Sequence, residues 1–238
     1  MKGFDLFSGM GGFHHAAHDL LGKEYETVAY CEIDPKARIA YEATLNHSSP
    51  KAFSDVNDIT GDLNPSLPHF ANKAQINSVL PNFDILFAGF PCQPFSSMGL
   101  RNGMDDPRGI LFNHIEAILA VKKPRYFILE NVRGIKTING GDVMRHIIST
   151  LQSIGYQTTT WMLNSADYGV PQTRRRIFFV GDLKGHNKNL DENMPPKKIL
   201  ASARRHKNVL DILEKDVDEK YFLSEKIKKT ILSSGTGG

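Results

Sequence analysis

Apolar and polar positions follow two different periods along the first two thirds of the chain. Short, nearly continuous apolar runs predict buried strands, and stretches with apolar residues every three or four positions predict amphipathic helices. The predicted strands are 2–7, 27–32, 84–90 and 125–131, and the predicted helices are 12–21, 35–45, 109–122 and 143–154. Strands that alternate with helices are typical of βαβ units, so we expect an α/β fold with a mostly parallel sheet.

The pattern changes after the last of these helices. Residues 156–165 and 175–182 predict two strands with no helix between them, and therefore an antiparallel hairpin at the end of the sheet. With this hairpin, the expected fold class is a Rossmann-like, doubly wound sheet. The stretch 46–83 contains four prolines and is expected to consist mainly of loops.

A shift in composition marks a second region toward the end of the sequence. Polar residues dominate from Gly185 onward, where 186–198 is typical of a linker and 219–232 has the spacing of a short amphipathic helix. We therefore expect one domain over 1–183. Residues 184–238 are expected to form a linker and the start of a second, incomplete domain.

The composition fits a globular protein. Hydrophobic residues make up 40% of the 238 positions and charged residues 23%. No apolar stretch approaches the roughly 18 residues that cross a membrane, and no secretory leader precedes the first strand. The two cysteines, Cys31 and Cys92, form neither a disulfide framework nor a zinc site. We expect a cytoplasmic protein with reduced thiols and no membrane partner.

The net charge of +3 is unevenly distributed. Residues 1–182 contain 17 Lys and Arg against 18 Asp and Glu, whereas residues 183–238 contain 12 against 8. A mildly basic tail permits a nucleic-acid partner, but a merely solvated tail has the same composition.

The sequence DLFSGMGGF, residues 5–13, predicts a glycine turn between the first strand and the first helix. Glycines there let the backbone approach a ligand closely, and the start of the helix offers unpaired N–H groups. Glu32 ends the next strand, where an acid accepts hydrogen bonds from a ribose diol in nucleotide-binding folds. The pattern favours a ribose-containing cofactor, and NAD and S-adenosylmethionine both satisfy it.

Cys92 lies in the rigid corner GFPCQPF, just past the end of a predicted strand, where packing alone gives little reason for a thiol. Cys31, inside a strand, is expected to be a small buried hydrophobe. Glu130 ends the neighbouring strand, so the side chains of Cys92 and Glu130 could face one pocket. No histidine base stands near Cys92, which argues against a protease or acyl transferase. A pyrimidine suits the pair, because the thiolate can attack C6 while the carboxyl group protonates N3.

Three further features concern charged or titratable side chains. Arg174 and Arg176 would share one face of the last strand, and either could hold a pyrimidine oxygen or a phosphate. Arg175 is expected to be solvated. His14 and His18 have a spacing that can hold a metal, but there is no third ligand, so we expect surface histidines and no metal.

These motifs together resemble the DNA cytosine-5 methyltransferases over about residues 3–182. The stretches DLFSGMGGF, CEID, GFPCQPFSSMG, ENV and DYGVPQTRRRIFFVG occur in the order typical of that family. The resemblance implies a class I S-adenosylmethionine-dependent fold, with residues 1–183 as the catalytic domain. Residues 184–238 would then begin an incomplete target-recognition domain.

The resemblance also implies a cofactor site for S-adenosylmethionine. Phe7 and the glycine turn would cradle the methionine and adenosine parts, Glu32 would hold the ribose, and Asp58 with Ile59 would contact the adenine edge. The full implied set is Phe7, Gly9, Met10, Gly11, Glu32, Ile33, Asp58, Ile59, Pro91 and Leu111.

For catalysis, the resemblance implies that Cys92 is the nucleophile at C6 and Glu130 the partner of N3. Arg176 and Arg174 would stabilise the attacked ring. The cytosine must leave the duplex, because C6 is inaccessible inside the base stack. The loop 96–109 would close over duplex DNA, and the implied DNA contacts are Gln93, Ser96 and Arg108.

The sequence departs from the family pattern after the catalytic motifs. The family continues with a target-recognition domain and a final motif that completes the cofactor pocket. We therefore expect a fragment or one subunit of a split restriction–modification enzyme, with a C-terminal half as partner. Such a chain alone would bind cofactor weakly and show little sequence-specific methylation.

Three other interpretations remain open at this point. A tRNA cytosine-5 methyltransferase would use the same chemistry on another substrate. A catalytically silent regulatory subunit would not need the nucleophile, acid and arginine that are all present. An NAD-dependent oxidoreductase would use the glycine turn, but it leaves Cys92, Glu130 and Arg176 without a role.

Overall fold

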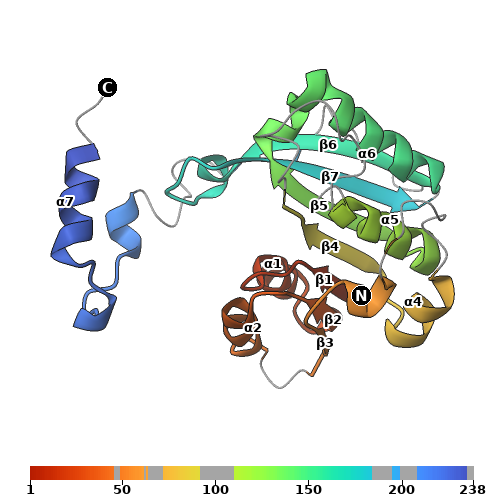
Figure 1. The fold of residues 1–238 in the computed structure, drawn as a ribbon, viewed down its shortest axis with the longest axis horizontal. Helices are drawn as coiled ribbons and strands as arrows, with labels where there is room; N and C mark the ends of the chain where they lie inside the picture. Colours follow the sequence, from red (N-terminus) through yellow and green to blue (C-terminus); the bar gives the residue numbers. More distant parts are fainter. Residues whose placement is uncertain are drawn as a thin grey trace. The chain divides into compact units, whose positions relative to one another are not determined.

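The computed structural model describes residues 1–45, 49–61, 63, 72–91, 110–183, 195–198 and 208–234. Within them, seven strands form one sheet in the order β3-β2-β1-β4-β5-β7-β6 (Figure 1). The strands are β1 Lys2–Leu6, β2 Glu26–Cys31, β3 Lys51–Phe53, β4 Ile85–Gly89, β5 Tyr126–Val132, β6 Tyr156–Asn164 and β7 Arg175–Leu183.

The sheet is parallel from β3 to β5 and ends in an antiparallel pair. β1 pairs in parallel with both β2 and β4, and β4 pairs in parallel with β5. β7 runs antiparallel to both β5 and β6. The chain therefore winds outward from β1 in one direction and from β4 in the other. The point where strand order reverses is where ligands bind in open α/β sheets.

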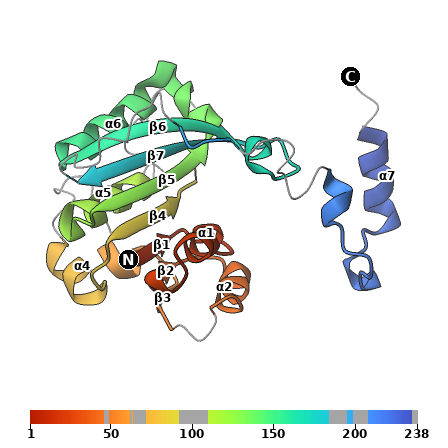
Figure 2. The same ribbon diagram turned by 180° about the vertical axis from the view of Figure 1, so that it is seen from behind.

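The helices of the unit that contains the sheet are α1 Gly12–Leu21, α2 Pro35–Glu42, α3 Asn57–Thr60, α4 Lys73–Val79, α5 Ile110–Lys122 and α6 Asp142–Ser153. They pack on two opposite faces of the sheet (Figures 1 and 2). Ala17 of α1 belongs to a small cluster with Ile85 and Phe87 on one face. On the other face, α3 to α6 contribute to a larger core that includes Leu86 and Leu129. Successive side chains of β4 point to opposite faces of the sheet, so they belong alternately to the small cluster and to the larger core.

The predicted elements of the sheet and its main helices are confirmed. The predicted helix 12–21 has the observed bounds, and the other predicted helices and strands before residue 184 differ from the observed ones by at most three residues at either end. Flanking glycines explain the sharp limits of α1. Gly11, at the N-cap, has φ 87°, and Gly22, at the C-cap, has φ 53°.

The expectation that 46–83 consists mainly of loops is wrong for part of that stretch. β3, α3 and α4 all lie within it. These elements are short, and α4 has a single buried side chain, Ile76. Periodicity is a weak signal over so few residues, because one apolar position does not define a face.

The fold contains a second compact unit, made of residues 165–173 and 198–238. Its described helical parts are a 3₁₀ turn at Ser165–Tyr168, two more at Val209–Ile212 and Glu219–Tyr221, and α7 Glu225–Ser234. The predicted helix 219–232 is therefore interrupted, because Phe222 has extended backbone angles. The domain boundary proposed between 183 and 184 stays a prediction.

Among the described helices, none combines the length and apolar character that a membrane span requires.

Candidate active site

A cavity of about 600 Å³ opens at the carboxyl ends of β1, β2 and β4. Its walls come from the residues that follow these strands and from α3 and α5. The lining residues are Phe7, Cys31, Glu32, Ile33, Asp55, Val56, Asn57, Leu63, Gly89, Pro91, Leu111 and His114. The cavity therefore lies where the strand order reverses, as doubly wound folds predict.

The glycine turn has a backbone that only some residues can adopt. Phe7 lines the cavity with φ 56°, which is rare for a residue with a side chain and marks local strain. Gly9 and Gly11 also have positive φ, and the N–H of Gly11 donates to the carbonyl of Ser8 at 2.9 Å. A Cβ at Gly11 would lie 2.9 Å from Cδ2 of Tyr41, so the turn packs too closely for any side chain there.

Glu32 fastens this turn to the end of β2. Its Oε2 accepts a hydrogen bond of 2.8 Å from the N–H of Gly9, and its Oε1 accepts one of 2.9 Å from the N–H of Asp34. Arg38 donates to the carbonyl oxygen of Glu32 at 2.8 Å, which fixes the backbone. Each carboxylate oxygen has a second lone pair, so Glu32 can still accept hydrogen bonds from a diol.

These features fit a nucleoside cofactor. The cavity has the size of a small-molecule site and is lined mainly by apolar side chains, with a carboxylate at one wall. A Cβ at Gly9 would project into open space, so the glycine leaves room beside the turn. Phe7, Glu32, Ile33, Pro91 and Leu111, all predicted cofactor residues, line this one cavity.

Gly9 and Gly11 lie in the turn beside the cavity, whereas three other predicted cofactor residues, Met10, Asp58 and Ile59, lie elsewhere. Met10 is 71% exposed and does not line the cavity. Ile59 is completely buried in the core. The carboxylate of Asp58 faces back along the chain, where its Oδ2 accepts from the hydroxyl of Ser54 and the N–H of Asp55. The structure thus does not bring Asp58 and Ile59 to the cavity.

The resemblance implies that Asp58 and Ile59 contact the adenine. The residues of this segment that line the cavity are instead Asp55, Val56 and Asn57. The sequence DVNDIT contains two aspartates three residues apart, and residues at this spacing lie on adjacent turns of a helix. The start of α3 at Asn57 places the first aspartate at the cavity. His114, one turn after Leu111 on α5, is a further lining residue that the sequence did not predict.

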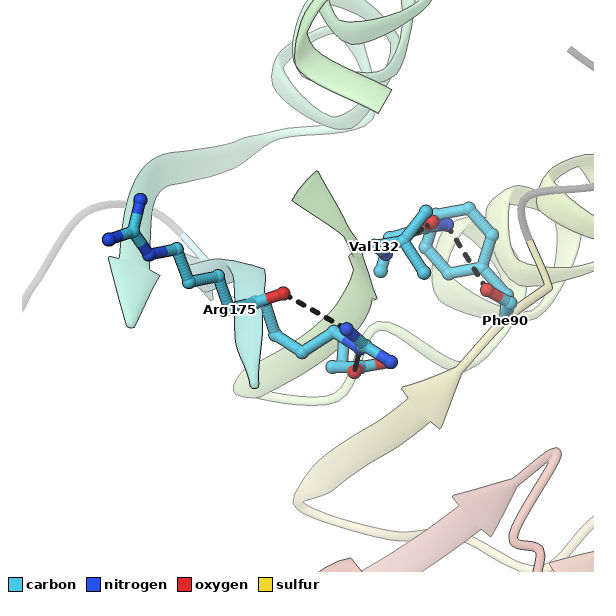
Figure 3. A network of polar contacts seen from close by, with 6 residues as sticks. Phe90, Val132 and Arg175 are labelled. Atoms are coloured by element: carbon cyan, nitrogen blue, oxygen red, sulfur yellow. Dashed lines mark hydrogen bonds and ion pairs between the residues drawn. The ribbon is translucent and has the colours of Figure 1, made fainter. Parts of the chain in front are cut away.

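Glu130 lies near this cavity, on the strand next to β4. It pairs with Gly89 in the register of β4 and β5, and a Cβ at Gly89 would lie 3.7 Å from its Oε2. Its other oxygen, Oε1, lies 2.7 Å from Nε of Arg176 (Figure 3). Arg176 also donates to the carbonyl of Arg175 at 3.0 Å, which orients the guanidinium. The sequence did not predict this ion pair.

Asn131 joins the ends of β4 and β5. Its Nδ2 donates to the carbonyl of Phe90 at 3.1 Å, and its Oδ1 accepts from the N–H of Val132 at 2.7 Å (Figure 3). Asn131 is buried, and its bond to Phe90 is shielded from water. The amide therefore holds the backbone two residues before Cys92 in the sequence.

The remaining predicted site residues divide into two groups. Arg174 is exposed, and its described hydrogen bond is made by its backbone N–H to Asn164. Four predicted residues lie outside the described part of the chain: Cys92, Gln93, Ser96 and Arg108. The predicted meeting of Cys92 with Glu130 thus stays a prediction, as does the loop 96–109.

The second cysteine and the histidines of α1 have clear surroundings. Cys31 is buried, as predicted, and burial raises the pKa of its thiol to about 12. His14 is also buried, so the expectation of a surface histidine is wrong for this residue. Its Nδ1 lies 2.8 Å from Oγ1 of Thr27. Within the described ranges, no three His, Cys, Asp or Glu side chains could hold a metal ion together.

Comparison with known proteins agrees with this geometry. The family model described as C-5 cytosine-specific DNA methylase matches residues 1–236. The type II methyltransferase M.NlaX of Neisseria lactamica is 39% identical over 230 residues, which cover 95% of this chain and 64% of the relative. M.HaeII of Haemophilus aegyptius is 38% identical over 240 residues, which cover 99% of this chain and 65% of the relative. The chain thus spans a little under two thirds of these relatives' length.

Solved structures show the same fold at lower identity. Dnmt2 methyltransferase of S. pombe superposes with a TM-score of 0.67 at 23% identity, covering 96% of this chain and 66% of that one. A DNMT2 variant from Spodoptera frugiperda gives a TM-score of 0.66 at 24% identity, with 97% and 65% covered. The family match covers almost the whole sequence, and the chain belongs to the C-5 cytosine-specific DNA methylase family.

Proposed function

We propose that this chain carries the catalytic part of a DNA cytosine-5 methyltransferase. It would transfer a methyl group from S-adenosylmethionine to C5 of a cytosine that has left the duplex. The observation that carries the proposal is the placement of Glu130 and its ion pair with Arg176 beside a nucleoside-sized cavity. The family membership of the chain supports the same reaction.

The cavity is the proposed site of S-adenosylmethionine, which supplies an electrophilic methyl group when bound. Glu32 would accept hydrogen bonds from the ribose hydroxyls. The backbone N–H groups of Gly9 and Asp34 already hold its two oxygens in place at the cavity. Ile33, Val56 and Leu111 would cover the apolar faces of the purine, and Asp55 would accept a hydrogen bond from its amino group.

Cys92 is the proposed nucleophile. Attack of its thiolate on C6 pushes an electron pair through the ring, and protonation of N3 by the Glu130 carboxyl group makes C5 nucleophilic. Methyl transfer to C5 would leave S-adenosylhomocysteine. Loss of the C5 proton to water, departure of the thiolate and return of the N3 proton to Glu130 would then restore the aromatic ring. Arg176 holds Oε1 of Glu130, so that Oε2 remains directed past Gly89.

The test is a covalent trap. The chain is mixed with S-adenosylmethionine and duplex DNA containing 5-fluorocytosine, which blocks the loss of the C5 substituent. The mixture is tested alone and with the part of M.NlaX that this chain does not match, and a parallel sample carries RNA. We expect a denaturation-resistant adduct with DNA that is absent in Cys92→Ala. An adduct that persists in Cys92→Ala would overturn the proposed nucleophile, and an adduct with RNA alone would reassign the substrate.

A further inference from the structure

Two parts of the cavity wall come from different helices that contact each other, α3 and α5. Val56 and Asn57, at the start of α3, form one wall, and Leu111 and His114, one turn apart on α5, form the other. The width between these walls decides whether a flat purine ring can fit between apolar side chains.

A buried hydrogen bond joins the two helices. Nδ1 of His114 lies 2.6 Å from Oγ1 of Thr60, the last residue of α3. Oγ1 of Thr60 also lies 3.1 Å from the carbonyl oxygen of Val56, a residue of the cavity wall. Both side chains are almost completely buried. Thr60 therefore connects the imidazole of α5 to the backbone of Val56, which belongs to the α3 part of the wall.

Stability alone does not explain a polar pair at this place. The surroundings on α3 and α5 are apolar, with Ile59 and Ile115 both in the main core. Replacing both partners of a buried hydrogen bond by apolar groups of similar shape is nearly neutral for stability. A hydrogen bond differs from an apolar contact because it fixes distance and direction, and here it fixes them between the two walls of the cavity.

We propose that His114 is a positioning residue for the cofactor, and that its bond to Thr60 sets the spacing of the two walls. This inference rests on the proposed cofactor site. Without the bond, α3 and α5 still pack, but Val56 loses its fixed position relative to Leu111. Ligand binding must then order this part of the site, which lowers the affinity.

The test compares the unfolding free energy with ligand affinity in a double-mutant cycle. Thr60→Val, His114→Leu and the double variant are made in the full chain. Urea denaturation measures stability, and calorimetry measures the Kd for S-adenosylhomocysteine. We expect the double variant to be nearly as stable as wild type but to bind about five- to tenfold more weakly, the range of one lost hydrogen bond. Each single variant should weaken binding at least as much.

Conservative variants separate positioning from general damage. Thr60→Ser keeps the hydroxyl, and His114→Asn keeps an N–H near the position of Nδ1, so both should bind within about twofold of wild type. His146→Leu, an exposed histidine on α6, serves as the matched control and should not change the Kd. A stable double variant with wild-type affinity would overturn the inference. Should the double variant fail to fold, the Kd values of Thr60→Ser and His114→Asn decide the test. Both variants keep the hydrogen bond, so weakened binding by both would contradict the positioning role of this bond. Failure of wild type itself to bind the probe would instead contradict the cofactor site.

Discussion

Nε of Arg176 lies 2.7 Å from Oε1 of Glu130, across the antiparallel pair of β7 and β5. The two side chains are 20% and 23% exposed, so the pair is partly shielded but open to a substrate. This contact ties the orientation of the proposed acid to one guanidinium. The other carboxylate oxygen, Oε2, lies beside Gly89 and is the one proposed to meet the pyrimidine.

Arg176→Ala should therefore slow the chemical step more than it weakens DNA binding. We expect the rate of adduct formation with 5-fluorocytosine DNA to fall roughly 100-fold, the lower range for a mispositioned acid catalyst. Rapid quenching under single-turnover conditions measures this rate. Arg175→Ala is the control, because its side chain points away from the ion pair (Figure 3). Equal losses of this rate in Arg176→Ala and Arg175→Ala would show that the positive charge, and not the ion pair with Glu130, accounts for the effect.

Glu32→Gln should weaken cofactor binding. The amide retains one acceptor oxygen, whereas the carboxylate now accepts backbone hydrogen bonds through both oxygens. Loss of one charge-assisted bond should raise the Kd for S-adenosylhomocysteine roughly tenfold, measured by calorimetry. The control Glu26→Gln, at an exposed position in β2, should leave the Kd for S-adenosylhomocysteine unchanged. An unaltered Kd in Glu32→Gln would remove this residue from the site.

The two adjacent glycines of the first turn should respond differently to alanine. Gly11→Ala requires a Cβ at φ 87° and 2.9 Å from Tyr41, so we expect a loss of at least about 2 kcal/mol in unfolding free energy. Gly12→Ala meets nothing within 4 Å and begins a helix, so its stability should stay within about 1 kcal/mol of wild type or rise. Urea denaturation of the two variants compares them directly, and similar losses would contradict the packing described for Tyr41.

The buried imidazole of His14 should make the fold sensitive to acid. Burial, together with His18 and His15, lowers the pKa of His14 from 6.5 to about 4. The unfolded chain thus takes up a proton near pH 6.5 that the folded protein accepts only near pH 4. This contribution to stability is complete above pH 6.5 and declines as the pH falls toward 4.

A variant isolates this effect from the other buried groups around it. Asp5 acts in the opposite direction, because burial raises the pKa of its carboxyl group well above the usual range, and its contribution declines as pH rises. Tyr25 and Tyr41, also near His14, titrate far above this range. His14→Asn keeps a polar side chain beside the hydroxyl of Thr27 but removes the group that titrates. Its unfolding free energy between pH 7 and pH 4.5 should fall less than that of wild type, and an equal fall would assign the acid sensitivity elsewhere.

Cys31 should remain unreactive in the trap experiment. Its thiol is buried and its pKa is raised to about 12, so almost no thiolate forms near neutral pH. Cys92→Ala leaves Cys31 as the only cysteine of the chain. Alkylation of this variant by iodoacetamide at pH 7.5 should therefore become rapid only after denaturation, as mass spectrometry can measure. Rapid labelling of the native variant would contradict the buried placement of Cys31.

The fold could be predicted from the sequence because its core elements carry strong local signals. The apolar run of β4 and the glycine-bounded helix α1 are examples, since each is specified within its own residues. The short elements β3, α3 and α4 could not be predicted, because each depends on pairing or packing with residues far away in the sequence.

Glu32 could be predicted from the residues alone because it stands at the end of a strand, and topology brings strand ends together. Phe7, Ile33, Pro91 and Leu111, which also line the cavity, followed only from the family resemblance. The choice of Asp55 over Asp58 depends on where α3 begins, which the sequence does not specify. His114 escaped notice because a polar residue on a helix is usually solvated, and only the tertiary contact with Thr60 shows otherwise.

The reversal of strand order between β1 and β4 separates the residues proposed to hold the ribose from those proposed to act on the base. Phe7 and Glu32 follow β1 and β2, whereas Glu130 and Arg176 belong to β5 and β7. Recognition of the donor's ribose and activation of the base would thus be encoded in separate halves of the polypeptide, while Leu111 and His114 on α5 complete the donor cavity from the second half. Evolution, or an engineer, could alter the acceptor half for another nucleobase while the donor half stays as it is.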